Sequence, residues 1–308
     1  MQQGKGLIYV LRNFWQSQPQ NIRDIIEVVI LSFVAAISAI IFQFGTNLIY
    51  SSTFLRFAIL SKIKFLIYSF ITIISTTLIS GFLLFKLAPE AAGSGIPQVK
   101  AAYKKDMGYI PLKPVIVKFL GGILSVGGGL SLGREGPSVY LGAGFASNLD
   151  GFLGKPKNFR RRAVLIGSAA ALAAAFNTPI AAIVFVIEEI LNELNNKNLG
   201  FTFFAAVIGA MVVHAIVGKQ PAFKLPFIES VSFIHYLIVP FVSIISSLLG
   251  SLFQKWTIGL RGKIKNIPIK NYFSNIYFLL FGAIFTWILG SIVFLLFGKV
   301  GVFGLGYQ

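Results

Sequence analysis

Glu135 is the residue best placed to do chemistry, because it lies in a glycine-rich apolar stretch within the segment GREGPS. Apart from Glu135 and its neighbour Arg134, no charged residue lies between Lys118 and Asp150. Pro137 favours the first turn of a helix, and a helix N-terminus attracts anions. We therefore expect ionised Glu135 to occupy an anion site, and protonated Glu135 to leave it. The alternative is a static ion pair with Arg134.

A second candidate anion site is the segment GSGIP at residues 93–97. Gly93 and Gly95 allow a tight turn and a close approach of the backbone to a ligand. Ser94 can cap the helix that follows, or donate its hydroxyl to an anion. The alternative is an ordinary helix cap without a ligand.

Two adjacent acids, Glu188 and Glu189, close an apolar segment that we expect to be helical. Acids at a helix C-terminus oppose the helix dipole, so these carboxylates should be compensated or used in proton transfer. The alternative is simple helix termination at a membrane surface. His214 and His235 stand at or near the ends of apolar runs and are expected to be packing or interfacial residues.

The composition indicates a membrane protein. The 308 residues are 56% hydrophobic and 12% charged, with a mean hydropathy of +0.79, whereas soluble domains carry about 25% charged residues. Uncharged runs long enough to span a bilayer are found at 28–55, 65–85, 163–187, 198–218, 230–254 and 271–298.

The net charge of +17 resides in short clusters between the apolar runs, which favours cytoplasmic loops over nucleic-acid binding. With no cysteine, the chain has neither disulfides nor cysteine-based metal or redox chemistry. Since no catalytic motif is present, we expect no enzyme activity, no metal and no cofactor.

Several apolar segments are too short to span a membrane alone. Glycines and prolines leave a short helix at 96–105, apolar runs at 119–133 and 136–149, and half-length segments at 163–176 and 178–191. Broken helices in membranes are tolerated where they line a polar cavity, and transporters aim half-helix N-termini at anions. The sequence therefore predicts an ion or solute transporter, with an anion as the favoured substrate.

GSGIP, GREGPS and GSAAALAAAFNTPIAAIVFVIEE, in this order, resemble the CLC family of chloride channels and chloride/proton antiporters, over about residues 20–308. The resemblance implies an all-α polytopic fold with inverted repeats. It also implies that Glu135 is the gating glutamate, and that Glu135 and Glu189 transfer protons. The anion-binding residues that it implies are Ser94, Gly95, Ile96, Gly136, Pro137 and Ser138.

The resemblance further implies chloride and protons as the transported ions, contact with membrane lipid, and a homodimer. Serine in GSGIP is similar to the chloride-preferring form, and fluoride transport is not expected. Because the family's later anion motif and late tyrosine are not visible, we expect a C-terminally incomplete second repeat. The predicted organisation is an amphipathic segment at 1–20 and a transmembrane domain at 21–308.

The expected location is a prokaryotic plasma membrane. The basic cluster at 155–162 is predicted to face the cytoplasm, with Glu189 close to the same side. The alternatives are a passive voltage- or pH-gated chloride channel and a truncated chain that does not transport.

Overall fold

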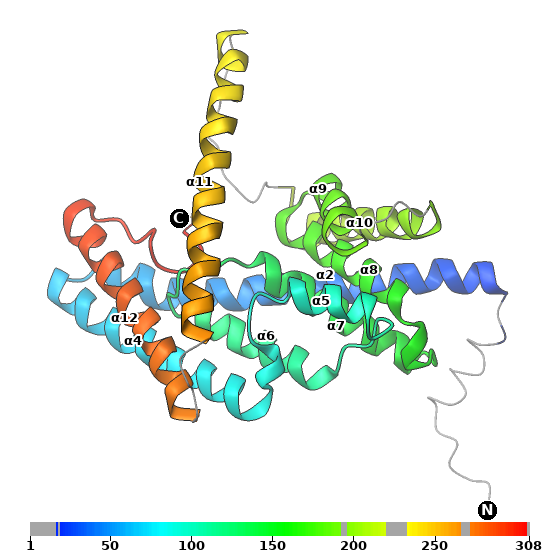
Figure 1. Ribbon diagram of the computed structural model, residues 1–308, viewed down its shortest axis with the longest axis horizontal. Helices are drawn as coiled ribbons and strands as arrows, with labels where there is room; N and C mark the ends of the chain where they lie inside the picture. The colour runs from blue at the N-terminus through cyan, green and yellow to red at the C-terminus, as the bar shows by residue number, and fades with distance from the viewer. Residues whose placement is uncertain (1–16, 18, 192–195, 220–232, 266–271, 307–308) are drawn as a thin grey trace, which may run out of the picture. The chain divides into compact units, whose positions relative to one another are not determined.

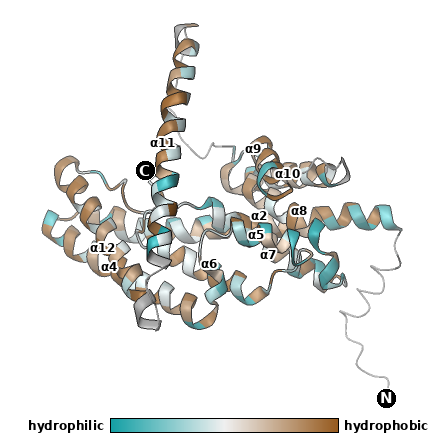
Figure 2. Cartoon of the chain, in the orientation of Figure 1, coloured by the Kyte–Doolittle hydropathy of each residue, from teal (hydrophilic) through white to brown (hydrophobic). Residues whose placement is uncertain are grey.

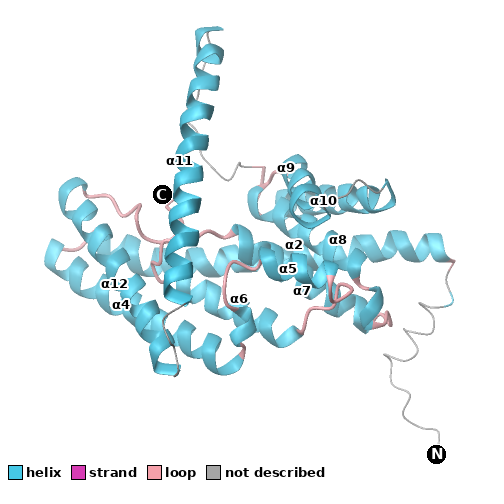
Figure 3. Ribbon diagram, viewed as in Figure 1, coloured by secondary structure: helices cyan, strands magenta, loops and turns pink. Residues whose placement is uncertain are grey.

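A computed structural model describes residues 17, 19–191, 196–219, 233–265 and 272–306, which form helices, turns and loops with no strand among them (Figures 1 and 3). The chain forms two compact units, Met1–Ala222 with Leu279–Gln308, and Phe223–Phe278. The proposed amphipathic segment 1–20 lies almost entirely outside the described residues. The division into 1–20 and 21–308 therefore stays a prediction.

Within the described residues, five helical stretches are long and apolar enough to cross a membrane: Gln20–Ala58, Lys62–Leu87, Asn198–Ile216, Tyr236–Lys263 and Ile276–Phe297. They correspond to the runs expected at 28–55, 65–85, 198–218, 230–254 and 271–298. The helices are α2 (Gln20–Tyr50) with α3 (Arg56–Ala58), α4 (Lys62–Phe82), α10 (Asn196–Ile216), α11 (Phe233–Lys265) and α12 (Tyr272–Phe297). Figure 2 shows hydrophobic residues dominating α4 and α12.

Shorter helices occupy the segments that the sequence marks as broken. They are α5 (Ile96–Lys104), α6 (Leu112–Gly127), α7 (Glu135–Phe152), α8 (Arg161–Phe176) and α9 (Pro179–Phe185), which continues as a π-helix over Val186–Leu191. α6 begins at Leu112, before the apolar run at 119–133 that the sequence shows. Pro114 lies in its first turn, where the ring is tolerated.

The break between α8 and α9 has a local cause. Asn177 adopts a left-handed conformation with φ of 55°, which asparagine tolerates better than most residues. Thr178 is the N-cap residue of α9 and Pro179 its first helical residue, as predicted, although the Thr178 side chain makes no capping hydrogen bond.

The α7–α8 pair is the tightest part of the core. A Cβ atom on Gly142 of α7 would meet the Gly167 carbonyl oxygen of α8, and one on Gly167 would meet the Gly142 carbonyl oxygen. Every residue of 163–175 is buried. The small side chains of α8 therefore allow the close helix packing that the sequence predicts.

A buried ion cluster joins the first turns of α2 to the end of α7 and the start of α8. Glu27 is 2% exposed and accepts hydrogen bonds from Lys155 and from the Arg162 guanidinium, the latter at 2.8 Å. Arg162 also bonds Asp24 at 2.8 Å, and Lys155 lies 3.6 Å from Asp150 at the end of α7. The ion cluster therefore holds the end of α7 and the start of α8 against α2, beside the basic cluster at 155–162.

Aromatic side chains form a second core around α4 and α12. Phe303, which follows α12, is fully buried, and its ring centroid lies 4.7 Å from that of Phe54. The next residue, Gly304, donates its N–H to the Gly129 carbonyl oxygen at 3.2 Å. The tail after α12 thus packs on the segment that leads from α6 to Arg134. Its described residues, 298–306, form bends and turns.

Candidate functional site

The two glycine-rich motifs are in direct backbone contact. A Cβ atom on Gly136 would lie 2.8 Å from the Ser94 carbonyl carbon and 3.0 Å from the Ser94 Cβ. A Cβ atom on Gly95 would lie 2.8 Å from both the Gly136 carbonyl oxygen and the Tyr140 Cβ, and Gly95 has φ of 110°. Only glycine allows this approach, because real Cβ atoms do not come within 3.0 Å of such neighbours.

Two helices begin at this contact. α5 starts at Ile96 after the N-cap residue Gly95, and α7 starts at Glu135 after Arg134. Neither start has a side-chain capping bond, and the first N–H groups of a helix have no partner within it. The prediction that Ser94 caps α5 is wrong by one residue, which leaves Ser94 exposed beside the helix end.

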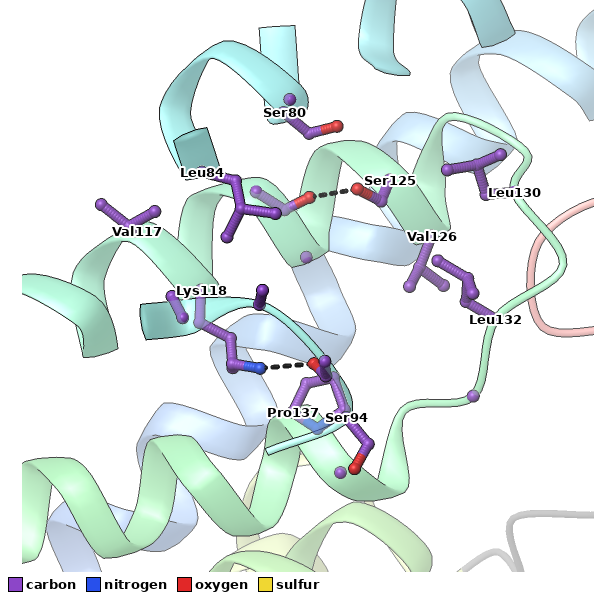
Figure 4. Close-up of a pocket in the computed structure, with 18 of the residues that line it drawn as sticks. Ser80, Leu84, Ser94, Val117, Lys118, Ser125, Val126, Leu130, Leu132 and Pro137 are labelled. Atoms are coloured by element: carbon purple, nitrogen blue, oxygen red, sulfur yellow. Dashed lines mark hydrogen bonds between the residues drawn. The ribbon is translucent and has the colours of Figure 1, made fainter. Parts of the chain in front are cut away.

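A cavity of about 570 Å³ opens between α4, α6 and these helix ends (Figure 4). Of the predicted site residues, it is lined by Ser94, Ile96, Glu135, Gly136 and Pro137. Gly95 and Ser138 are buried and do not line it. The structure therefore gathers most of the predicted anion-binding residues and the predicted gating glutamate around one space.

Buried hydroxyl groups add donors to this region. Thr77 of α4 lines the cavity, is 1% exposed, and its hydroxyl has no hydrogen-bond partner among the described residues. The buried hydroxyl of Ser138 in α7 is likewise without a described partner. Buried polar groups are nearly always satisfied, so these hydroxyls are available to a ligand or to water.

Lys118 of α6 is a site residue that sequence analysis missed. It lines the cavity, is 7% exposed, and its Nζ donates to the Gly93 carbonyl oxygen at 2.7 Å (Figure 4). The same ammonium lies 5.0 Å from the centroid of the Tyr140 ring. The sequence does contain an indication of Lys118, because a single lysine between the apolar segments VIV and FLGGILSV is a charged residue within a membrane segment, and such residues are usually functional.

Arg134 and Glu135 occupy different surroundings. Arg134 is 3% exposed, and its guanidinium carbon lies 4.7 Å from the centroid of the Phe176 ring at the end of α8. Glu135 is exposed, lines the cavity, and places a carboxylate oxygen beside Gly133. The glutamate is thus presented to the cavity while the arginine packs into the protein.

Glu189 does not line this cavity. It lies in the π-helix after α9, with its side chain 52% exposed and an oxygen 4.0 Å from the Nζ of Lys100 in α5. Leu191 lines a different cavity together with Arg161 and Arg162, so this segment ends beside the basic cluster. The side of the membrane that Glu189 faces stays a prediction. His214 is exposed, and the side chain of His235 lies outside the described residues.

A family model for voltage gated chloride channels matches residues 76–308, and the chain belongs to this family, the CLC proteins.

Solved structures of CLC proteins share the fold. A slow cyanobacterial Cl⁻/H⁺ antiporter aligns with a TM-score of 0.74 and 21% identity, over 89% of this chain and 64% of that protein. A eukaryotic CLC transporter aligns with a TM-score of 0.68 and 20% identity, over 98% of this chain and 57% of that protein. A CLC-type fluoride/proton antiporter aligns with a TM-score of 0.66 and 20% identity, over 93% of this chain and 69% of that protein. The all-α CLC-type membrane fold is confirmed, and the chain spans 64% of the length of the cyanobacterial protein.

Proposed function

We propose that this chain forms part of a chloride/proton exchanger in which Glu135 is the gate. The observation that carries the proposal is the position of Glu135, which is both the first residue of α7 and a residue of the cavity lining. An ionised carboxylate and a chloride ion compete for the same unpaired N–H groups at a helix start.

In the proposed cycle, ionised Glu135 accepts hydrogen bonds at the start of α7 and excludes chloride. A proton added to a carboxylate oxygen removes the negative charge, and the neutral side chain leaves. Chloride then takes the vacated place, held by backbone N–H groups and by the Ser94 hydroxyl. When chloride departs and Glu135 returns, the proton is released, so the two ions move in exchange.

Lys118 supports an anion as the substrate of this cavity. A buried ammonium raises the local affinity for negative charge, while its bond to the Gly93 carbonyl oxygen holds the loop that carries Ser94. The site still depends mainly on dipoles, because conduction requires that the ion can also leave. Chloride is proposed over fluoride because Ser94 is similar to the chloride-preferring form of the GSGIP motif.

Glu189 is proposed as the internal proton acceptor. Its exposure and its position near the basic cluster support access to the cytoplasm, where positive loops reside. Lys100 couples it to α5, the helix whose other end begins at Gly95. A homodimer in a prokaryotic plasma membrane is proposed with the same function.

A passive chloride channel is the second candidate, favoured by the description of the matching family as voltage gated chloride channels. Proteoliposomes decide between the two. An exchanger takes up protons when a chloride gradient drives chloride outward, and Glu189→Ala abolishes that proton uptake. Chloride flux without proton movement in the unmodified chain supports the channel. No flux of either ion identifies the chain as non-transporting.

A further inference from the structure

A second cavity, of about 770 Å³, lies at the opposite end of the α7–α8 pair from Glu135. Its walls come from the end of α5, the turn that contains Met107, the loop before α8, and the starts of α8 and α10. It shares no lining residue with the cavity of about 570 Å³ that Glu135 lines. The proposed exchange cycle does not use it.

Three cations line this cavity: Lys104, Arg161 and Arg162. The charge of Arg162 is matched by its bonds to Asp24 and Glu27 in the ion cluster. Arg161 instead donates to the Lys104 carbonyl oxygen at 3.0 Å and lies 5.8 Å from the centroid of the Tyr103 ring. Among the described residues, no carboxylate lies within ion-pair distance of Arg161, so its guanidinium charge can act on an anion in the cavity.

The start of α8 adds to the positive electrostatic potential in the cavity. Arg161 and Arg162 are the first two residues of the 16-residue helix, and the preceding residue, Arg160, makes no side-chain capping bond. The first N–H groups of α8 therefore lack partners within the helix and carry the positive end of its dipole. Backbone N–H groups and the guanidinium groups of neighbouring arginines can both donate hydrogen bonds to the oxygens of a phosphate group.

The rim of the cavity is apolar. Phe159 and Met107 both line it and are 66% and 42% exposed. Aromatic residues beside cations are typical of the zone where lipid headgroups meet acyl chains. A ligand with a phosphate and an attached apolar chain would contact both kinds of surface.

We propose that this cavity binds the phosphate ester of an anionic lipid headgroup. Basic pockets between membrane helices on the cytoplasmic side have this chemistry. The phosphate lies between Lys104, Arg161 and the first turn of α8, and the acyl chains lie against Phe159. Free phosphate offers the same oxygens without the apolar chain, so the source must be tested separately.

Native mass spectrometry of the 308-residue chain, delipidated and titrated with dioleoyl phosphatidic acid or dioleoyl phosphatidylcholine, tests the proposal. The phosphatidic acid should bind more tightly. The double variant Lys104→Gln/Arg161→Gln should weaken its binding about thirtyfold, as expected for the loss of two cations near a membrane surface. The double variant Lys62→Gln/Lys64→Gln removes the same charge from the start of α4, and should bind as the unmodified chain does.

Competition with inorganic phosphate distinguishes the source. If millimolar phosphate leaves the lipid bound, the ligand is the lipid headgroup. If phosphate displaces the lipid and depends on the same two cations, the site is a phosphate site filled from solution. Equal binding of the two lipids, or equal losses in the two double variants, overturns the proposal. Circular dichroism shows whether each variant is folded.

Discussion

Ser94 and Gly136 touch backbone to backbone, which joins the loop before α5 to the first turn of α7. A Cβ atom on Gly136 would lie 2.8 Å from the Ser94 carbonyl carbon. This contact places the starts of α5 and α7 at one cavity, so that two helix N-termini lie beside the same space. The geometry of the site therefore depends on the absence of a side chain at Gly136 and at Gly95.

Gly136→Ala should separate these helix starts and weaken chloride binding. Overpacking at such a contact costs about 1–3 kcal/mol, and a cost of that size in the chloride-bound arrangement corresponds to a loss of about 5-fold to 150-fold in affinity. Isothermal titration with chloride measures it. Gly200→Ala is the matched control, because its Cβ would meet nothing within 4 Å. Equal chloride affinities in the two variants would show that the contact does not shape the site.

Lys118→Met should lower chloride affinity by about tenfold, because it removes the buried ammonium and its bond to the Gly93 carbonyl oxygen. Methionine fills a similar volume, so folding should persist. Lys113→Met removes the same charge from an exposed position of the same helix and should have little effect. Titration of both variants checks this, and an equal loss in both would assign the effect to net charge alone.

Gly142→Ala and Gly167→Ala should each destabilise the fold by about 1–3 kcal/mol, because the new methyl group meets a carbonyl oxygen of the facing helix. Denaturation followed by tryptophan fluorescence measures the change. Gly282→Ala serves as the control, since its Cβ would meet nothing within 4 Å. A stability like that of the control would mean that the α7–α8 crossing is looser than described.

Glu27→Gln should destabilise the chain by about 3–5 kcal/mol, because it leaves Lys155 and Arg162 partly unpaired where Glu27 is buried. Glu90→Gln removes an exposed acid and should change stability by less than about 0.5 kcal/mol. The same denaturation assay compares them. If the two variants lose equal stability, the ion cluster does not hold α2 against α8.

The helix breaks could be predicted from the sequence because their causes are local. Gly95 is the N-cap residue of α5 and Pro179 is the first residue of α9. Gly136 and Pro137 lie in the first turn of α7, which begins at Glu135. These helix starts follow from the backbone preferences of glycine and proline. The start of α6 was missed, because Pro114 looks like a break and instead occupies a first turn.

Contacts between distant segments could not be predicted in this way. Lys118 joins the site only because α6 packs beside the 93–95 loop, and one lone lysine gives no indication of its partner. The pairing of Glu27 with Arg162 likewise depends on how α2 crosses α8. Side-chain partners that are far apart in sequence follow from tertiary packing, whereas glycine and proline act on their own backbone.

The gating role of Glu135 is tested most directly by measuring chloride and proton fluxes together in proteoliposomes, for the unmodified chain and for Glu135→Gln. Glutamine keeps the shape of the side chain and removes its negative charge and its titratable proton. We expect proton uptake driven by chloride efflux in the unmodified chain, and chloride flux without proton uptake in the variant. Unchanged proton coupling in Glu135→Gln would contradict the gating role.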